Sequence, residues 1–385
     1  GRLVALLTLT FKSLGPRMCE DTEEDFERTA SLGRPAPRVD AAKITLDLIL
    51  VRPDLYVELG PLVDKLIFDP HPAVRLEAML YLCRIWELDR KGFWQRLSKH
   101  LNTESNQGVL DHVISNVLGR VLHQAPSQVM QLALELLNRF SGMPERQARM
   151  RKALSVLLVI LWINYEQQVA YEVVFNWISA PTGHFAELNK TVGMLRGAIV
   201  AGLGSDGRDG DASRRHRFQA LAVAITKAVD NNFAALIAFE APDETTRKQA
   251  SELARLLDFI CRELYFASGA SRNTQHAEPV LGENGLRIFF DEVGEMLEVI
   301  GNNATPHTVY YLLQLMEFLL PIDAERAFDL TAHALCNGGR KTGYQFESLG
   351  ADLSAKLIGL FLADYKELFD DKGRRDALIE CLEIF

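Results

Sequence analysis

The sequence predicts an all-α protein made of stacked antiparallel helix hairpins. Apolar residues recur with helical spacing along most of the 385 residues, and the alternating pattern of strands is nearly absent. Several helical patterns are separated only by short connections that contain proline, which brings consecutive helices into antiparallel contact. The 26 glycines and 14 prolines are too few for a turn-rich all-β fold.

Residues 1–39 predict an N-terminal helix followed by an acidic linker. Leu3–Leu7 is an apolar helical pattern, and the proline-bounded stretch Pro16–Arg38 contains the acidic run Glu20–Asp25, with room for one short helix. A secretory signal requires a basic region before the apolar stretch and a cleavage site of small residues after it. Neither accompanies the first 15 residues, so no secretory leader is expected. Because the chain starts at Gly1 and ends at Phe385 within apolar helical patterns, we expect it to be a segment of a longer protein.

A helical array is expected from residue 40 to 266, and helix hairpins that continue it from 286 to 385. Two segments interrupt the pattern: Gly202–Arg215, rich in glycine and aspartate and expected to be mobile, and the polar segment Ala267–Gly285, where we place a domain boundary. The helices expected in chain order are Asp40–Val51, Leu55–Phe68, Pro72–Leu88, Val109–His123, Ser127–Phe140, Arg146–Tyr165, Gln168–Ser179, His184–Val200, Arg217–Asn231, Glu244–Tyr265, Leu286–Ile300, Pro306–Leu320, a helix after Asp323 that carries Ala327, Leu330, Ala334 and Leu335, and then Phe346–Phe369 and Gly373–Phe385.

Two hairpins have clear end signals. The helix Ser127–Phe140 carries a continuous apolar stripe, and Ser127 is expected to cap it because its hydroxyl can accept from the free N–H groups of the first turn. Near the C-terminus, Thr305 is expected to cap a helix that starts at Pro306, and Asp323 to cap the helix after it.

The segment Leu55–Leu88 resembles a HEAT repeat. The pattern of that family has a proline in the first helix, an aspartate in the turn, and a valine and an arginine early in the second helix. Here these residues are Pro61, Asp69, Val74 and Arg75. The resemblance implies an α-solenoid of the HEAT or armadillo kind.

Helix chemistry supports this resemblance. We expect Asp69 to cap the second helix, Val74 to be buried between the helices, and Arg75 to reach an acidic turn of a neighbouring repeat. A partly exposed ion pair contributes little, so Arg75→Ala is expected to cost about 0–1 kcal/mol. Shifting the motif by 35 residues places Glu104 at the aspartate position and Leu110 at the arginine position, which is a degenerate second copy. Such periods are typical of helical solenoids, and the motif content covers residues 40–140.

No cofactor, metal or catalytic motif is apparent. No histidine is followed by glutamate, which excludes the di-iron site of the HEAT-type hydroxylases, and neither HExxH nor a P-loop occurs. The glycine pattern Gly202–Gly207 follows a helix where a dinucleotide site needs a strand, so a linker is the better interpretation. The cysteines Cys19, Cys83, Cys261, Cys336 and Cys381 form no evident disulfide framework, as in a reducing compartment.

Nucleic acid binding is the alternative function. Enzymes with HEAT-like folds bind damaged DNA through a basic groove with aromatic residues, and this chain has four tryptophans and the basic residues Arg214, Arg215 and Arg217, which are candidate contacts to phosphate or to a partner. Trp162 lies in the most apolar helix and is expected in the core. The net charge of −9 opposes binding to phosphates.

The sequence therefore favours a non-catalytic scaffold or sensor that binds a protein partner or other domains of its own chain. The stretch Thr305–Phe385 also resembles the helical tail of large bacterial ATP-binding proteins, some of them defence-associated and NLR-like, which implies a regulatory role. The longest apolar run, Val156–Ile163, has 8 residues, so no membrane span is expected and the location is expected to be cytoplasmic.

Overall fold

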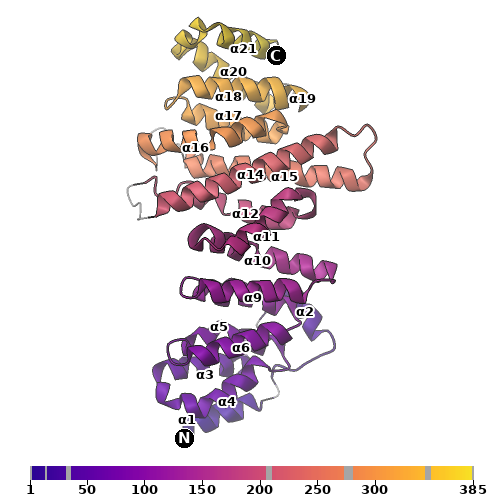
Figure 1. Cartoon of the computed structure of the whole chain (residues 1–385), viewed down its shortest axis with the longest axis vertical. Coiled ribbons are helices and arrows are strands. Elements are labelled where there is room, and N and C mark those ends of the chain that lie inside the picture. The colour runs from indigo at the N-terminus through magenta and orange to yellow at the C-terminus, as the bar shows by residue number, and fades with distance from the viewer. Residues whose placement is uncertain are drawn as a thin grey trace. The chain divides into compact units, whose positions relative to one another are not determined.

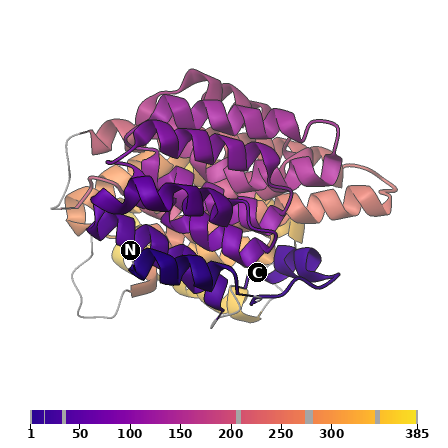
Figure 2. The same ribbon diagram turned by 90° about the horizontal axis from the view of Figure 1, so that it is seen from below.

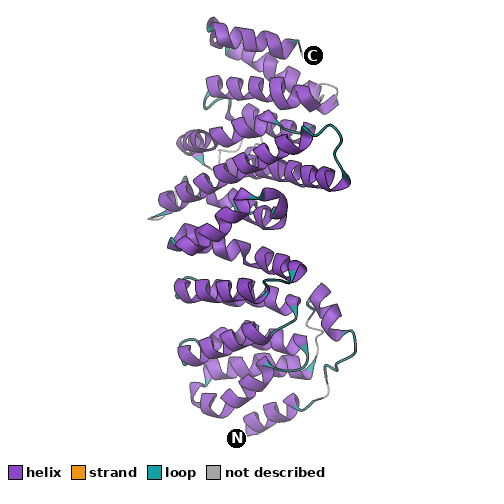
Figure 3. Cartoon of the chain, turned by 45° about the vertical axis from the view of Figure 1, so that its right-hand side comes forward, coloured by secondary structure: helices purple, strands orange, loops and turns teal. Residues whose placement is uncertain are grey.

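The computed structural model describes residues 2–13, 15–31, 36–204, 210–272, 281–342 and 348–383. Within these ranges the chain is helical and has no strand (Figure 3), so the predicted all-α class is confirmed. The α-helices are α1 (Arg2–Phe11), α2 (Thr22–Thr29), α3 (Pro37–Val51), α4 (Tyr56–Ile67), α5 (Pro72–Tyr81), α6 (Arg90–Thr103), α7 (Gln107–Val113), α8 (Gly119–Val121), α9 (Pro126–Arg139), α10 (Pro144–Tyr165), α11 (Gln168–Ser179), α12 (Phe185–Val192), α13 (Leu195–Ala198), α14 (Asp211–Ile237), α15 (Glu244–Ser268), α16 (Gly282–Asn302), α17 (Pro306–Leu319), α18 (Ala324–Ala334), α19 (Arg340–Thr342), α20 (Ser348–Asp364) and α21 (Lys372–Leu382).

The chain divides into two compact units, Gly1–Ala170 and Tyr171–Phe385. The boundary between them lies within α11. The segment Ala267–Gly285, where the sequence places a boundary, falls inside the second unit, and residues 273–280 of it lie outside the described residues.

In the first unit, the helices alternate between two rows. In one row α3, α5, α7 and α10 contact each other in chain order, and in the other α4, α6 and α9 do the same. Helix α2 packs against α5 and α7, and an extended connection separates it from α1 (Figures 1 and 2). Side chains between the rows are fully buried, among them Val39, Leu66, Val74, Phe93 and Val113.

The second unit is built in the same way. One row contains α14, α16, α18 and α21, and the other contains α12, α15, α17 and α20, each helix contacting the next in its row. Successive layers such as α17 with α18 are visible in Figure 1. The core between the rows includes Leu257, Phe289, Leu297, Met316 and Phe361.

Several helix ends differ from the prediction. The expected caps Thr305 and Asp323 are confirmed, because their side-chain oxygens accept from the backbone N–H of Thr308 and of Arg326. Ser127 is not a cap, because α9 starts one residue earlier, at Pro126. The expected helix His184–Val200 is broken between α12 and α13.

Two segments of the structure differ more strongly from the sequence prediction. Helix α6 has no counterpart in the sequence prediction, although Asp89 caps it by accepting from the backbone N–H of Gly92 at 2.7 Å. The segment Gly202–Arg215 is not a loop throughout, because α14 starts at Asp211, so that Arg214 and Arg215 are helical. Residues 205–209 lie outside the described residues.

Among the described residues, α14 is the one helix whose length and apolar composition would allow it to cross a membrane. This is weak evidence, because core helices of water-soluble proteins have the same properties. In the second unit, α14 packs against α15 and α16 and buries Phe218, Ile225 and Val229.

Candidate functional site

The four residues of the repeat motif lie around the turn between α4 and α5. Pro61 is on the exposed side within α4, and Val74 is completely buried, as predicted. Asp69 does not cap α5. Its Oδ1 accepts from the backbone N–H of His71 at 2.8 Å, and the ring Nδ1 of His71 caps the helix by accepting from the backbone N–H of Ala73 at 3.2 Å.

Arg75 is the centre of a buried ionic network in the first unit. Its Nε lies 2.7 Å from Oε2 of Glu104, and its Nη2 lies 3.0 Å from Oε1 of Glu23 on α2. The side chains of Arg75 and Glu104 are only 12% and 2% exposed. Burial opposes the charge on Arg75, but the hydrogen bonds to Glu104 and Glu23 outweigh it and raise the pKa of the guanidinium. The expected contact with an acidic neighbouring turn is present, but the pair is buried rather than partly exposed.

The degenerate second copy of the motif has the same turn geometry. Glu104 accepts from the backbone N–H of Asn106 at 2.9 Å, as Asp69 does from His71. Asn106 then caps α7 by accepting from the backbone N–H of Val109 at 3.2 Å. Leu110 replaces the arginine and is fully buried. The network holds the turns of successive hairpins together, and each of its carboxylates already accepts from arginine or backbone groups.

The basic cluster at the start of α14 is engaged within the protein. The side chain of Arg215 is 7% exposed, lies 2.9 Å from Oε2 of Glu292 and donates to the backbone oxygen of Ala201 at 2.7 Å. Arg214 pairs with Asp211 at 2.6 Å between Nη2 and Oδ1. Arg217 is half-buried on the same helix. These guanidinium groups do not form an open patch for phosphate.

The tryptophans do not gather into a base-stacking surface. In the first unit, Trp86 and Trp94 stack edge-to-face on the buried Phe93, with ring centroids 5.0 and 5.2 Å from it. Trp177 is buried, whereas Trp162 is half-buried and not in the core as expected.

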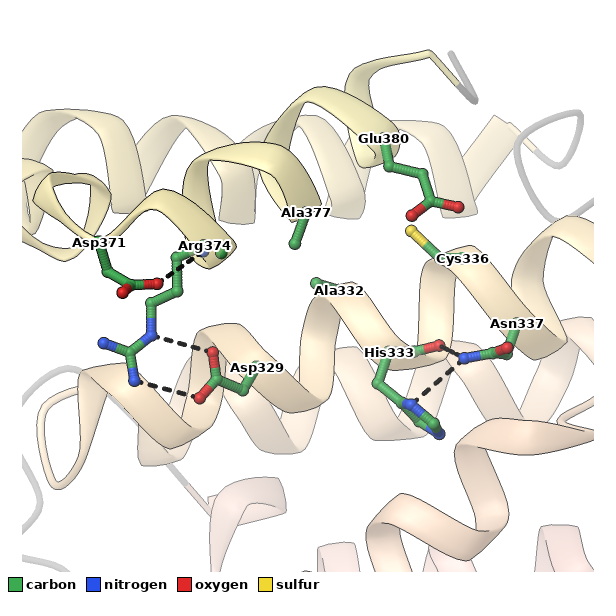
Figure 4. Close-up of a pocket in the computed structure, with 10 residues that line it drawn as sticks. Asp329, Ala332, His333, Cys336, Asn337, Asp371, Arg374, Ala377 and Glu380 are labelled. Atoms are coloured by element: carbon green, nitrogen blue, oxygen red, sulfur yellow. Dashed lines mark hydrogen bonds and ion pairs between the residues drawn. The ribbon is translucent and has the colours of Figure 1, made fainter.

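A hollowed, charged face lies on one row of the second unit. We call it the α16–α18–α21 face. A hollow of about 520 Å³ lies between α18 and α21, and one of about 490 Å³ lies between α16 and α18. Asp329 and His333 line both hollows. Figure 4 shows the first hollow, with side chains of α21 on one side and of α18 on the other.

Acidic side chains dominate this face. The arginines that line the hollows, Arg326 and Arg374, are both paired: Arg326 Nη1 lies 2.6 Å from Oδ1 of Asp291, and Arg374 Nε lies 3.0 Å from Oδ1 of Asp329 (Figure 4). Lys227 and Arg340, beside the hollows, pair with Glu295 and Glu380. The carboxylates that line the two hollows are Glu295, Glu298, Asp329, Asp371 and Glu380. Glu298 is exposed and forms no ion pair with another described residue. The face therefore presents excess negative charge.

Hydrogen bonds to α16 hold the histidine that lines both hollows. The Nε2 of His333 lies 3.0 Å from Oδ1 of Asn302 and 3.1 Å from the backbone oxygen of Glu298, which fixes the ring against α16. Over the described ranges, no three histidine, cysteine or acidic side chains converge to hold a metal ion. This face was not predicted from the sequence, although Asp291, Glu295 and Glu298 share one side of a helix.

No protein-family model matches this sequence, and no curated protein is significantly similar to it.

Proposed function

We propose that the chain is a non-catalytic α-solenoid of the HEAT kind, and that it binds a protein partner through the α16–α18–α21 face. The observation that carries the proposal is this hollowed acidic face on a row of helices that contact each other in chain order. Helices stacked in this way expose an extended surface that is suited to an elongated partner. Cytoplasmic location and a place within a larger protein belong to the same proposal.

The charge on the face determines the chemistry of the partner. Carboxylates outnumber guanidinium groups around both hollows, and Glu298 forms no ion pair with another described residue. Complementary charge favours a partner segment rich in lysine and arginine and accelerates its association. We expect binding that weakens as the salt concentration rises.

Nucleic acid is the less favoured partner. The acidic face repels phosphates, and the ion pairs of Arg214 and Arg215 with Asp211 and Glu292 leave little cationic surface at the start of α14. A regulatory role beside an ATP-binding domain is compatible with the proposal, since the partner segment can belong to the same polypeptide.

Fluorescence anisotropy tests the proposal with three labelled probes: a lysine- and arginine-rich peptide, an acidic peptide of equal length and a DNA duplex. We expect only the basic peptide to bind, and Glu298→Lys to weaken its binding about five- to tenfold. The matched control is Glu252→Lys on α15, which changes the net charge equally at a half-buried position outside the face. Equal losses for the two variants, or preferential binding of the duplex, would contradict the proposal.

A further inference from the structure

Two cysteines that are far apart in the sequence meet in the second unit. The Sγ atoms of Cys336 and Cys381 lie 3.6 Å apart, although the residues are separated by 45 positions. Cys336 belongs to a π-helical turn, Leu335–Gly339, that follows α18, and Cys381 lies in the last turn of α21. Such turns shift side chains out of the α-helical register and often occur at functional positions.

The two thiols have different surroundings. Cys336 is half-buried and lines the hollow between α18 and α21, where Figure 4 shows its sulfur directed toward α21, near Glu380. Cys381 is buried, with 2% of its surface exposed. Access from solvent is therefore through Cys336.

The thiol that solvent can reach is also the more acidic of the two. The hydrogen bond with Cys381 lowers the pKa of Cys336, and the charge of Arg340 adds to this, while burial and Glu380 act in the opposite direction. The same hydrogen bond, together with burial, raises the pKa of Cys381. Cys336 thus has the greater thiolate character, and Cys381 is a neutral thiol in contact with it.

We propose that Cys336 and Cys381 form a reversible disulfide when the protein meets a hydroperoxide. The Cys336 thiolate attacks one peroxide oxygen, the O–O bond breaks, and a sulfenic acid forms while hydroxide or alkoxide leaves and takes up a proton. The Cys381 sulfur then attacks the sulfenic sulfur, the S–O bond breaks, and water leaves with the Cys381 proton. The two thiols are oxidised by two electrons, and hydrogen peroxide is reduced to two water molecules.

The disulfide would join α21 covalently to the end of α18. In the reduced protein, the ionic contacts between these segments are the pair of Arg374 with Asp329 and Glu325, and the exposed pair of Arg340 with Glu380. We therefore expect the backbone amides of α21 to exchange hydrogen more slowly after oxidation, by about tenfold.

The other cysteines are poorer candidates for oxidation to a disulfide. Burial raises the pKa of Cys83 and of Cys261. Cys19 is exposed, so it is replaced by serine in all test proteins to prevent disulfides between chains. In this background the proposal predicts oxidation at Cys336 and Cys381 at least about tenfold faster than at Cys83.

The test treats the reduced Cys19→Ser chain with equimolar hydrogen peroxide, alkylates free thiols and maps tryptic peptides by mass spectrometry without reductant. We expect peptide 376–385 joined to the peptide that contains Cys336, and dithiothreitol should release it. Free, alkylated thiols at both positions, or sulfinic acid at Cys336 with Cys381 still alkylated, would overturn the proposal.

Variants separate the two steps. Cys381→Ser should leave a sulfenic acid at Cys336 that dimedone traps, and Cys336→Ser, at the less buried position, should abolish the cross-link while the protein stays folded. Cys83→Ser should form the cross-link at the wild-type rate. A cross-link that persists in Cys336→Ser, or one that Cys83→Ser abolishes, would show that other thiols react.

Discussion

The guanidinium of Arg75 lies between a buried carboxylate, Glu104, and a half-exposed one, Glu23. Its removal takes away the ion pair of the Glu104 carboxylate, whose side chain is only 2% exposed. We predict that Arg75→Ala lowers the free energy of unfolding by about 3 kcal/mol. Removing one partner of a buried ion pair leaves the other partner buried without a compensating charge. Urea denaturation followed by tryptophan fluorescence measures this, because three of the four tryptophans lie in the first unit.

The control is Arg90→Ala. Arg90 pairs with Glu87 on the surface, where both side chains are more than half exposed, so the loss should stay below about 0.5 kcal/mol. A loss at Arg75 as small as that at Arg90 would agree with the partly exposed pair expected from the sequence, and it would contradict the buried network.

His100 gives the first unit a pH dependence. The ring is 1% exposed, and burial lowers its pKa from 6.5 to about 4, although the nearby Glu104 opposes the shift. At neutral pH the ring is therefore uncharged, and its 3.6 Å approach to Glu104 is not an ion pair. As the pH falls from 6.5 to 4, the unfolded chain binds a proton that the folded chain excludes, so stability is lost over this window.

We predict that the free energy of unfolding of wild type falls by up to about 3 kcal/mol more than that of His100→Gln as the pH falls through this window. This figure follows from about 1.36 kcal/mol for each unit by which the pKa is lowered. Urea denaturation at a series of pH values measures the difference. His112→Gln, at an exposed position of α7, should show the same dependence of the unfolding free energy on pH as wild type. Parallel curves of unfolding free energy against pH for wild type and His100→Gln would mean that the folded chain protonates His100 as readily as the unfolded chain does, and would contradict the lowered pKa.

At the scale of helices, glycines set how closely α16 and the end of α18 approach. A Cβ at Gly338 would lie 2.6 Å from the backbone nitrogen of Ala304, which is too close for any real contact. We predict that Gly338→Ala lowers the unfolding free energy by about 1–3 kcal/mol, because backbone has to move. Chemical denaturation followed by circular dichroism measures the loss.

Gly359→Ala is the matched control for this prediction. Gly359 lies within α20, and a Cβ there would meet nothing within 4 Å. Alanine should therefore stabilise the helix by about 0.5–1 kcal/mol. Destabilisation by both substitutions, or by neither, would argue against the close packing at Gly338.

The helices that the sequence predicts best are those with long apolar stripes and side-chain caps. Gln168–Ser179 is reproduced end to end as α11, and the caps Thr305 and Asp323 are present. Helix α6 was missed because its polar and aromatic sequence hides a buried stripe of Phe93, Leu97 and Leu101, four residues apart.

The functional surfaces could be predicted less well. The residues of the α16–α18–α21 face are spread over the chain from Gly294 to Glu380, and its hollows depend on how three helices pack. The contact of Cys336 with Cys381 depends on a π-helical turn, for which local spacing gives no signal. The basic run at Arg214 and Arg215 was visible, but its pairing with Glu292, 77 residues beyond Arg215, was not.

At the scale of the whole chain, each unit has two rows of helices, and each row is connected by contacts between successive members. In the second unit, ion pairs join consecutive helices of one row: Arg215 with Glu292, Arg326 with Asp291, and Arg374 with Asp329. The pairs of Arg326 and Arg374 engage both arginines that line the two hollows. The remaining carboxylates are the basis for proposing a basic partner.

Hydrogen exchange on the full chain, with and without the lysine- and arginine-rich peptide, tests the proposed binding face most directly. We predict slower exchange in α16, α18 and α21 when the peptide is bound, and little change in α15, α17 or the first unit. Protection confined to the first unit or to the row of α15 and α17, or no protection at saturating peptide, would contradict the proposal that the α16–α18–α21 face binds the partner.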